Sequence, residues 1–236
     1  MDDGTYGNRL LNSLPADVTR RLLRGAELVP LPLKTILFEP SQEIMSVHFP
    51  TGGVISLVTP HSDGSIVEVA TIGNEGIVGV PLVLGDGFAA VRAISQVAGE
   101  AIRVDATAFV NEVTRGGEMA TLVQRYMSAL FSQISVAAGC NRLHPNEERL
   151  SRWLLMSSDR VGSDDFPITQ EFLGQMLGSR RATVTMSAGV LQKAGLISYR
   201  NGKLRILDRA GLEAASCECY AVIKHELDRV VTRTAD

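Results

Sequence analysis

The chain has 236 residues, of which 45% are hydrophobic and 21% charged, and its formal net charge is −3 at pH 7. This composition is ordinary for a globular protein of one or two domains, and it excludes a disordered chain. The first residues, MDDGTYGNRLLNSL, are acidic and contain no long apolar run. We therefore expect neither a secretory signal nor a membrane span, and we place the protein in the cytoplasm.

Two short helices and a β-rich segment are predicted in the first half of the chain. Apolar residues with helical spacing lie on either side of Pro15, which suits the start of a helix. They are Leu10, Leu11, Leu14, Val18, Leu22 and Leu23. From residue 28 to residue 104, short apolar runs broken by Gly, Pro and Asp are typical of a β-sandwich or β-barrel. Asp63-Gly64 marks the clearest hairpin, and residues 73–76 and 85–87 mark two further tight turns.

A long helix is predicted next, because the apolar periodicity changes near residue 116 from two to about 3.6 residues. A helix of this length between two domains is well placed to pair with its copy. We therefore favour a symmetric dimer over the alternative of a core helix that only covers the β-rich domain. The residues expected at the dimer interface are Leu122, Tyr126, Leu130 and Ile134.

A helix-turn-helix is predicted between residues 168 and 195. Thr169 can cap a first helix over residues 170–177, and Gly178 suits the left-handed conformation that often ends a helix. Ser179 is expected to cap the second helix, which Gly195 ends.

The second helix of this motif begins with two cations, Arg180 and Arg181, where the helix dipole favours anions instead. Phosphate groups at this end would neutralise the arginines and accept the free backbone N–H groups. The polar front of the helix is expected to consist of Arg180, Arg181, Thr183 and Thr185. The apolar side is expected to contain Val184, Val190 and Leu191, with Met186 and Ala188 as further members.

Two strands, at residues 196–199 and 203–207, follow this helix and are joined by Arg200-Asn201-Gly202, a strong hairpin signal. Helix, turn, helix and hairpin together describe a winged helix-turn-helix. Residues 168–209 contain seven basic and two acidic side chains and carry a net charge of +5 within a chain of net charge −3. A basic module on an acidic body is typical of a nucleic-acid-binding protein.

Two stretches of the chain resemble the Crp/Fnr family of bacterial transcription regulators. The first is LFEPSQEIMSVHFPTGGVISLVTPHSDGSIVEVATIGNEGIVG, and the second is ITQEFLGQMLGSRRATV with the wing ISYRNGKLRIL. The resemblance implies an α+β fold with an N-terminal β jelly roll (1–115), a long dimerisation helix (116–143) and a C-terminal winged helix-turn-helix (144–236). It also implies a homodimer that senses an effector in the roll, binds pseudo-palindromic double-stranded DNA and contacts RNA polymerase.

The resemblance assigns DNA contacts to individual residues of this chain. Arg181 matches the arginine that reads guanine in the major groove. Two other base-reading positions of the family are occupied here by Ala182 and Met186, so the family's half-site sequence does not transfer. Arg180 is a further arginine, beyond the matched base-reading positions. The positions that match phosphate contacts are Thr169, Gln170, Ser179, Thr183 and Lys203.

The family's cyclic AMP anchors are missing from the roll. Gly79-Val80 stands where relatives have Gly-Glu, and Gly87-Phe88 stands where they have an Arg-Ser or Arg-Thr pair. A buried phosphate without a cation has a large desolvation penalty. We therefore expect that cyclic AMP does not bind in the usual manner. Arg92 is expected to be an outward-facing charge.

No cofactor, metal site or enzymatic activity is predicted. The N-terminal region has no cysteine for an iron–sulfur cluster, and His48 and His61 are too far apart for a cupin-type metal site. Cys217 and Cys219, with His225 nearby, give only weak grounds for a metal site and are expected to be ordinary thiols. The remaining alternative is a sensor module that regulates a partner protein instead of DNA.

Overall fold

The computed structural model describes residues 5–85, 87–200 and 202–232. Two short helices come first, as the apolar spacing predicts: α1 (Arg9–Ser13) and α2 (Ala16–Leu22). Asn8 caps α1, since its side-chain oxygen accepts two backbone N–H groups of the first turn. Pro15 lies directly before α2, which supports its predicted role at the start of that helix.

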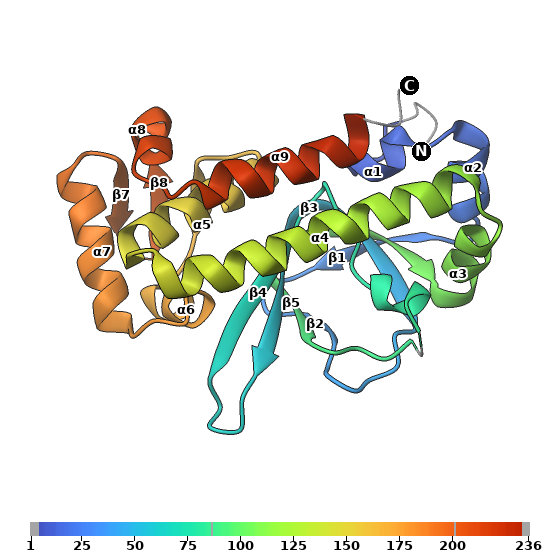
Figure 1. The fold of residues 1–236 in the computed structure, drawn as a ribbon, viewed down its shortest axis with the longest axis horizontal. Coiled ribbons are helices and arrows are strands. Elements are labelled where there is room, and N and C mark those ends of the chain that lie inside the picture. Colours follow the sequence, from blue (N-terminus) through green and yellow to red (C-terminus); the bar gives the residue numbers. More distant parts are fainter. Residues whose placement is uncertain (1–4, 86, 201, 233–236) are drawn as a thin grey trace.

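An antiparallel β-roll follows (Figure 1). Its strands are β1 (Glu27–Leu31), β2 (Ile36–Phe38), β3 (Ser46–Pro60), β4 (Ile66–Ile72) and β5 (Arg92–Asp105). The strand order is β1-β5-β3-β4, and β2 pairs with β5. Strands β3 and β4 form the hairpin predicted at Asp63-Gly64. In the turn predicted at residues 85–87, Asp86 lies outside the described residues.

Several short runs of the sequence merge into two long strands, β3 and β5, which bend together at glycines. Gly53 has φ +77°, and a Cβ atom there would lie 2.5 Å from the carbonyl oxygen of Val97. Gly99 on the facing strand approaches the backbone of Gly52 just as closely, and the register shifts between Gly52 and Val54. Only glycine fits such an approach without moving the partner strand.

The apolar run at residues 77–84 does not form the strand that its composition predicts. Val78 makes one isolated bridge to His48, and the chain then forms a short 3-10 helix, η1 (Val80–Val83). Pro81 explains the difference, because it has no backbone N–H group to donate to a neighbouring strand.

Helix α3 (Ala106–Thr114) leads into the long helix α4 (Gly117–Leu143), which crosses the roll (Figure 1). Leu122 and Tyr126 are 0% and 1% exposed within the single chain, and Leu130 is 9% exposed. Ile134 also packs partly buried against the same core. The prediction that these residues form a dimer interface is therefore wrong for Leu122 and Tyr126, because the apolar stripe of α4 covers the chain's own roll.

The C-terminal part is built mainly of helices. Its elements are α5 (Asn146–Val161), β6 (Asp165–Pro167), α6 (Gln170–Met176), α7 (Arg181–Lys193), β7 (Ile197–Arg200), β8 (Lys203–Ile206), α8 (Arg209–Ala214) and α9 (Cys219–Thr232). The three strands pair in the order β6-β8-β7. Helix α9 returns along α4 (Figure 1). The antiparallel roll, long helix and C-terminal helix-turn-helix confirm the predicted α+β fold.

Polar contacts from α5 attach the C-terminal part to the roll, among them one from Gln96 Nε2 of β5 to Ser157 Oγ at 3.5 Å. Arg160 Nε lies 2.7 Å from Glu75 Oε1, and both side chains are buried. Trp153 Nε1 donates to Glu68 Oε1 on β4 at 2.9 Å. These contacts fix α5, and the helix-turn-helix packed on it, against the roll. None of the helices in the described ranges is long and apolar enough to cross a membrane.

Candidate DNA-binding surface

The first helix of the motif, α6, is capped as the sequence predicts. Thr169 Oγ1 accepts a hydrogen bond from the Phe172 backbone N–H at 3.2 Å. The helix ends at Met176, one residue earlier than predicted, and Leu177 forms its C-cap. Gly178 then has φ +57°, the left-handed conformation expected there.

The predicted cap of the second helix is wrong. Helix α7 begins at Arg181, and Arg180 occupies the N-cap position without a side-chain cap hydrogen bond. The Ser179 hydroxyl instead donates to Asn146 Oδ1 at 2.7 Å. Because no side chain caps α7, its first backbone N–H groups are open to an external acceptor.

The apolar side of α7 is narrower than predicted. Val184, Ala188 and Leu191 are buried, as expected. Val190 and Met186 are 52% and 66% exposed, so their assignment to the apolar side is wrong. The buried side of α7 also includes a serine, Ser187, next to Ala188. Its hydroxyl accepts a hydrogen bond from Asn146 at the start of α5.

The predicted contact residues lie on connected elements. Arg180, Arg181, Thr185, Thr169 and Lys203 are exposed, and Ser179, Gln170 and Thr183 are half-buried. Thr185 Oγ1 lies 2.8 Å from Gln170 Oε1 and can donate to it, which joins the starts of α6 and α7. The structure thus brings the α6 and α7 contacts together at one end of the motif.

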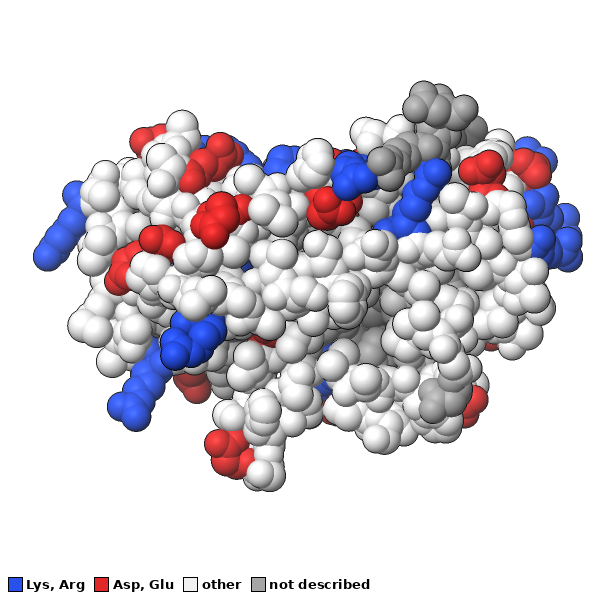
Figure 2. Space-filling model, in the orientation of Figure 1, with Lys and Arg blue, Asp and Glu red and all other residues white. Residues whose placement is uncertain are grey.

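The two arginines at the start of α7 are not neutralised internally. Within the part of the chain that the structure describes, neither Arg180 nor Arg181 has an acidic side chain within ion-pair distance, and the same holds for Lys203. Figure 2 shows basic side chains that project at the end of the molecule where α7 lies. An uncapped helix N-terminus with two free guanidinium groups is suited to bind phosphate and base edges.

The wing is held close to α6. Strands β7 and β8 form the predicted hairpin, with Arg200 opposite Lys203. Asn201, the first residue of the predicted Asn-Gly turn, lies outside the described residues. Tyr199 donates its hydroxyl to the carbonyl oxygen of Ile168 at 2.9 Å, immediately before the α6 cap. Burial raises the pKa of Tyr199, so the hydroxyl keeps the proton that it donates.

Sequence reasoning missed the residues of α5 that position α7. Asn146 accepts from Ser179 and donates to Ser187 Oγ at 3.1 Å, and Ser187 donates to Glu147 Oε1 at 2.8 Å. The start of α5 therefore holds both the turn before α7 and the middle of α7. The only available signal was the polar Asn146-Glu147 pair directly after Pro145.

The roll has no charged group at the two positions that the family uses for cyclic AMP. Gly79 is left-handed at the start of η1, and Val80 is buried. Phe88 is 47% exposed. Arg92 is half-buried and paired with Glu39, with Nε 2.8 Å from Oε2.

The structure separates the two histidines of the roll but brings the C-terminal cysteines next to other candidate metal ligands. His48 is buried, which lowers its pKa to about 4, whereas His61 is exposed at the β3–β4 turn, so the structure does not bring them together. Cys217 and Cys219 do meet other candidate ligands. These are Cys140 of α4 and His144, the C-cap of that helix, and not His225. The spacing of Cys140 and His144, one helical turn apart, was the overlooked signal.

Comparison with known proteins agrees with this geometry. A family model, the Crp-like helix-turn-helix domain, matches residues 148–215. No curated protein matched the sequence. FixK2 from Bradyrhizobium japonicum has a similar structure, with a TM-score of 0.70 at 13% identity, covering 81% of this chain and 98% of that one.

Two other solved structures are similar over comparable lengths. The global regulator CLP of Xanthomonas campestris, described as responsive to c-di-GMP, has a TM-score of 0.65 at 15% identity and covers 81% of this chain and 99% of its own. A Crp/Fnr-family regulator of Thermus thermophilus has a TM-score of 0.63 at 17% identity, covering 80% and 98%.

The fold and the surface together define a winged helix-turn-helix protein with an N-terminal β-roll. Residues 148–215 form a Crp-like helix-turn-helix domain, and the whole chain has a fold similar to that of solved Crp/Fnr-type structures. The helix-turn-helix and the fold that the resemblance implied are confirmed.

Proposed function

We propose that the chain is a sequence-specific transcription regulator that binds double-stranded DNA as a homodimer and senses an effector through its β-roll. The observation that carries the proposal is the uncapped start of α7, with Arg180 and Arg181 exposed and unpaired among the described residues. Arg181 contacts a base edge in the major groove. The residues that contact the DNA phosphate backbone or lie beside it are Thr169, Gln170, Ser179, Thr183, Thr185 and Lys203. Ser179 orients the turn through Asn146 and meets phosphate from there.

The dimer contact lies on the exposed side of α4, and not on the apolar stripe. Residues on that side recur at alternating spacings of three and four, the repeat by which two helices pair. They are Thr121, Gln124, Ser128, Phe131, Ser135, Ala138 and Arg142. Phe131, at the centre, is 73% exposed, and its neighbours in the row are short. Figure 2 shows few charged side chains over α4, which also favours a close helix pair.

A dimer of this kind sets the DNA target. Two copies of α7 held roughly 34 Å apart would read a pseudo-palindromic site of two half-sites. The domain division that we propose is the one expected from the sequence: a sensor over 1–115, a dimerisation helix over 116–143 and a DNA-binding domain over 144–236. RNA polymerase is the expected partner at a promoter, and cyclic AMP is not the expected effector. Isothermal titration that gave micromolar cyclic AMP binding would contradict this last point.

DNA binding is tested by selecting bound sites from a random duplex library and measuring affinity across salt concentrations. Affinity should fall steeply with salt, because bound phosphates release counterions. Arg181→Ala should relax sequence choice and cost about 1–3 kcal/mol on the selected site, whereas Lys203→Ala should weaken all duplexes about equally. Arg24→Ala, an exposed arginine near α2, is the control and should change nothing.

Two outcomes would contradict the proposal. Absence of any salt-dependent duplex binding would favour a module that regulates a partner protein. Equal, sequence-independent losses from Arg181→Ala and Lys203→Ala would refute the assigned roles. The dimer is tested separately by light scattering, where Phe131→Glu should give monomers. Met45→Glu is the control at another exposed apolar residue, on the roll, and should not give monomers.

A further inference from the structure

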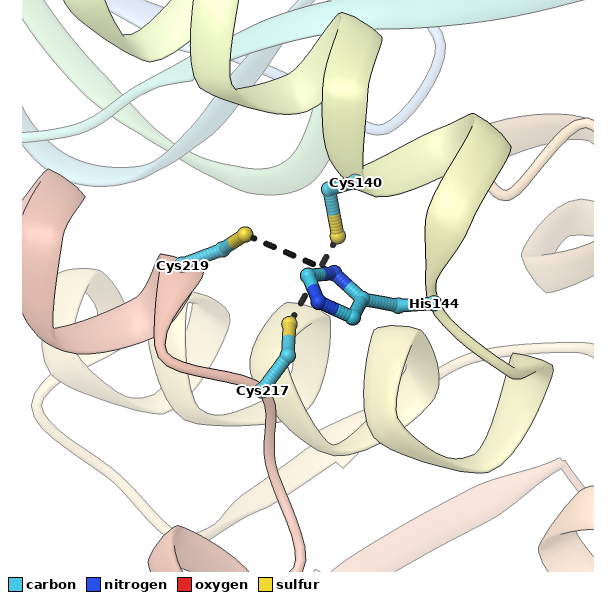
Figure 3. Close-up of side chains that lie close together, drawn as sticks. All are labelled: Cys140, His144, Cys217 and Cys219. Carbon is cyan, nitrogen blue, oxygen red and sulfur yellow. Dashed lines mark hydrogen bonds between the residues drawn. The ribbon is translucent and has the colours of Figure 1, made fainter.

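Four metal-ligating side chains meet where α4 ends (Figure 3). Cys140 lies in the last turn of α4, and His144 is its C-cap. Cys217 comes from the segment between α8 and α9, and Cys219 is the first residue of α9. One ligand atom from each of the four residues can be chosen so that all lie within 4.8 Å of one another.

The distances suit one tetrahedral metal ion. Zn–S bonds of about 2.3 Å and Zn–N bonds of about 2.0–2.1 Å place tetrahedral sulfurs about 3.8 Å apart, and sulfur and nitrogen about 3.6 Å apart. Cys140 Sγ lies 3.5 Å from Cys217 Sγ, and Cys219 Sγ lies 3.6 Å from His144 Nδ1. An iron–sulfur cluster would spread the sulfurs more widely, because its cysteines bind different irons.

The cluster is more than a patch of buried thiols. The three cysteines are 1%, 4% and 6% exposed and form a small core apart from the main one, with Val136 as their partly buried apolar neighbour. An imidazole is a poor filler for such a core. The ring of His144 is instead oriented, with Nδ1 towards Cys219 and Nε2 3.3 Å from Glu218 Oε1. Metal-bound histidines typically make this second contact to a carboxylate.

Positive charge is available to balance an anionic site. Three thiolates around a divalent ion leave a charge of −1. Arg149 and Arg152 are buried on the adjacent helix α5, and the charge of each interacts with Cys140. The Nε atoms of both arginines are buried and have no hydrogen-bond partner among the described residues. A negative centre beside them would compensate charges that are otherwise costly to bury.

We propose that Cys140, His144, Cys217 and Cys219 bind one Zn²⁺ ion in a closed tetrahedral site, with His144 ligating through Nδ1 and Glu218 holding the ring. On binding, each thiol releases its proton to solvent, so the ion is exchanged for three protons. Four protein ligands leave no open position, which makes the site structural and not catalytic.

The position of the site defines its role. Residues 144–145 connect α4 to α5, and Cys217 and Cys219 tie the start of α9 to the same point. A bound ion would therefore fix the joint between the long helix and the helix-turn-helix. Metal loading would set how the C-terminal part is held relative to α4.

The test uses the full chain, purified under reducing conditions without chelator and then reconstituted with Zn²⁺ or Co²⁺. We expect one metal ion per chain by elemental analysis, and a Co²⁺ spectrum with tetrahedral and thiolate charge-transfer bands. Cys140→Ser and Cys217→Ser should each lower metal affinity at least about 100-fold, and Glu218→Gln about tenfold. His225→Gln is the control, since His225 lies on α9 outside the cluster, and it should bind as the unmodified chain does.

A second measurement on the unmodified chain covers the case in which the serine variants do not fold. Bound Zn²⁺ should protect all three cysteines from alkylation until a strong chelator is added. The proposal is overturned by less than about one tenth of an equivalent of metal after reconstitution. It is equally overturned by unchanged binding in the folded serine variants, by an iron–sulfur chromophore, or by a Cys140–Cys217 disulfide in the reduced preparation.

Discussion

Arg160 is expected to be the most sensitive single position in the attachment of the C-terminal part. Its Nε lies 2.7 Å from Glu75 Oε1, and its Nη2 donates to Gln133 Oε1 of α4 at 3.2 Å. The side chains of Arg160 and Glu75 are 5% and 7% exposed. One guanidinium group thus joins α5, the turn after β4 and α4.

Arg160→Met keeps most of the side-chain volume and removes the charge. Glu75 would keep a hydrogen bond from the backbone N–H of Gly73 at 3.2 Å, while its Oε2 already lacks a partner among the described residues. Removing one partner of a buried ion pair costs about 3–5 kcal/mol, because the other charge stays buried. We expect a loss of this size in the free energy of unfolding.

The double variant Arg160→Met/Glu75→Gln separates charge from packing. With both charges gone it should be more stable than Arg160→Met alone, with a coupling of up to about 3 kcal/mol. Urea unfolding, followed by circular dichroism and by the fluorescence of Trp153 on α5, measures the free energy of unfolding of the single and the double variant. Arg205→Met is the control, because its exposed pair with Asp165 is worth less than about 1 kcal/mol. A loss below about 1 kcal/mol for Arg160→Met, or a double variant no more stable than it, would refute the reasoning.

Three further predictions concern single positions. Burial raises the pKa of Glu68 to about 7 from 4.5, so its contribution to stability is present below about pH 4.5 and lost as the pH rises through 7. In Glu68→Gln, the decrease in the free energy of unfolding between low and high pH should be smaller by up to about 3 kcal/mol, as measured by urea unfolding at a series of pH values. A pH profile unchanged from that of the unmodified chain would contradict this prediction. Gly174→Ala should cost about 1–3 kcal/mol and weaken DNA binding, because a Cβ atom would lie 2.9 Å from the carbonyl oxygen of Ser179. Gly189→Ala, with open space around it, should stabilise by up to about 1 kcal/mol in the same thermal unfolding assay. Thr169→Ala should lose about 1 kcal/mol with the α6 cap and Thr169→Ser much less; equal losses would show that the hydroxyl does not act as the cap.

The helix-turn-helix was predictable because its signals are local. Thr169 and Gly178 each fix a helix end through their own backbone and side chain, and both were placed correctly. Ser179 was misplaced for a non-local reason, since its hydroxyl bonds to Asn146, 33 residues earlier. Sequence spacing cannot show that a distant asparagine competes for a cap.

The long helix shows a different limit. Periodicity identifies which side of α4 is apolar, and that side was read correctly from Leu122 to Ile134. It does not tell what covers that side. The roll does so in the structure, and the interface that we propose lies instead on the more polar row through the exposed Phe131. The same ambiguity explains the error in α7, where Met186 and Val190 were assigned to the apolar side but are exposed.

The cysteine cluster was hidden by sequence distance, because Cys140 and Cys217 are 77 residues apart. The structure brings these cysteines together beside α5, so that each end of α5 contacts another part of the chain. Arg149 and Arg152 lie near the cluster at one end, and Arg160 meets Glu75 of the roll at the other. A helix held at both ends cannot turn unless one attachment changes. A signal that reorients α7 through α5 would have to act on such attachments, and the Arg160 and Cys217 variants test two of them, the ion pair with the roll and the cysteine cluster, independently.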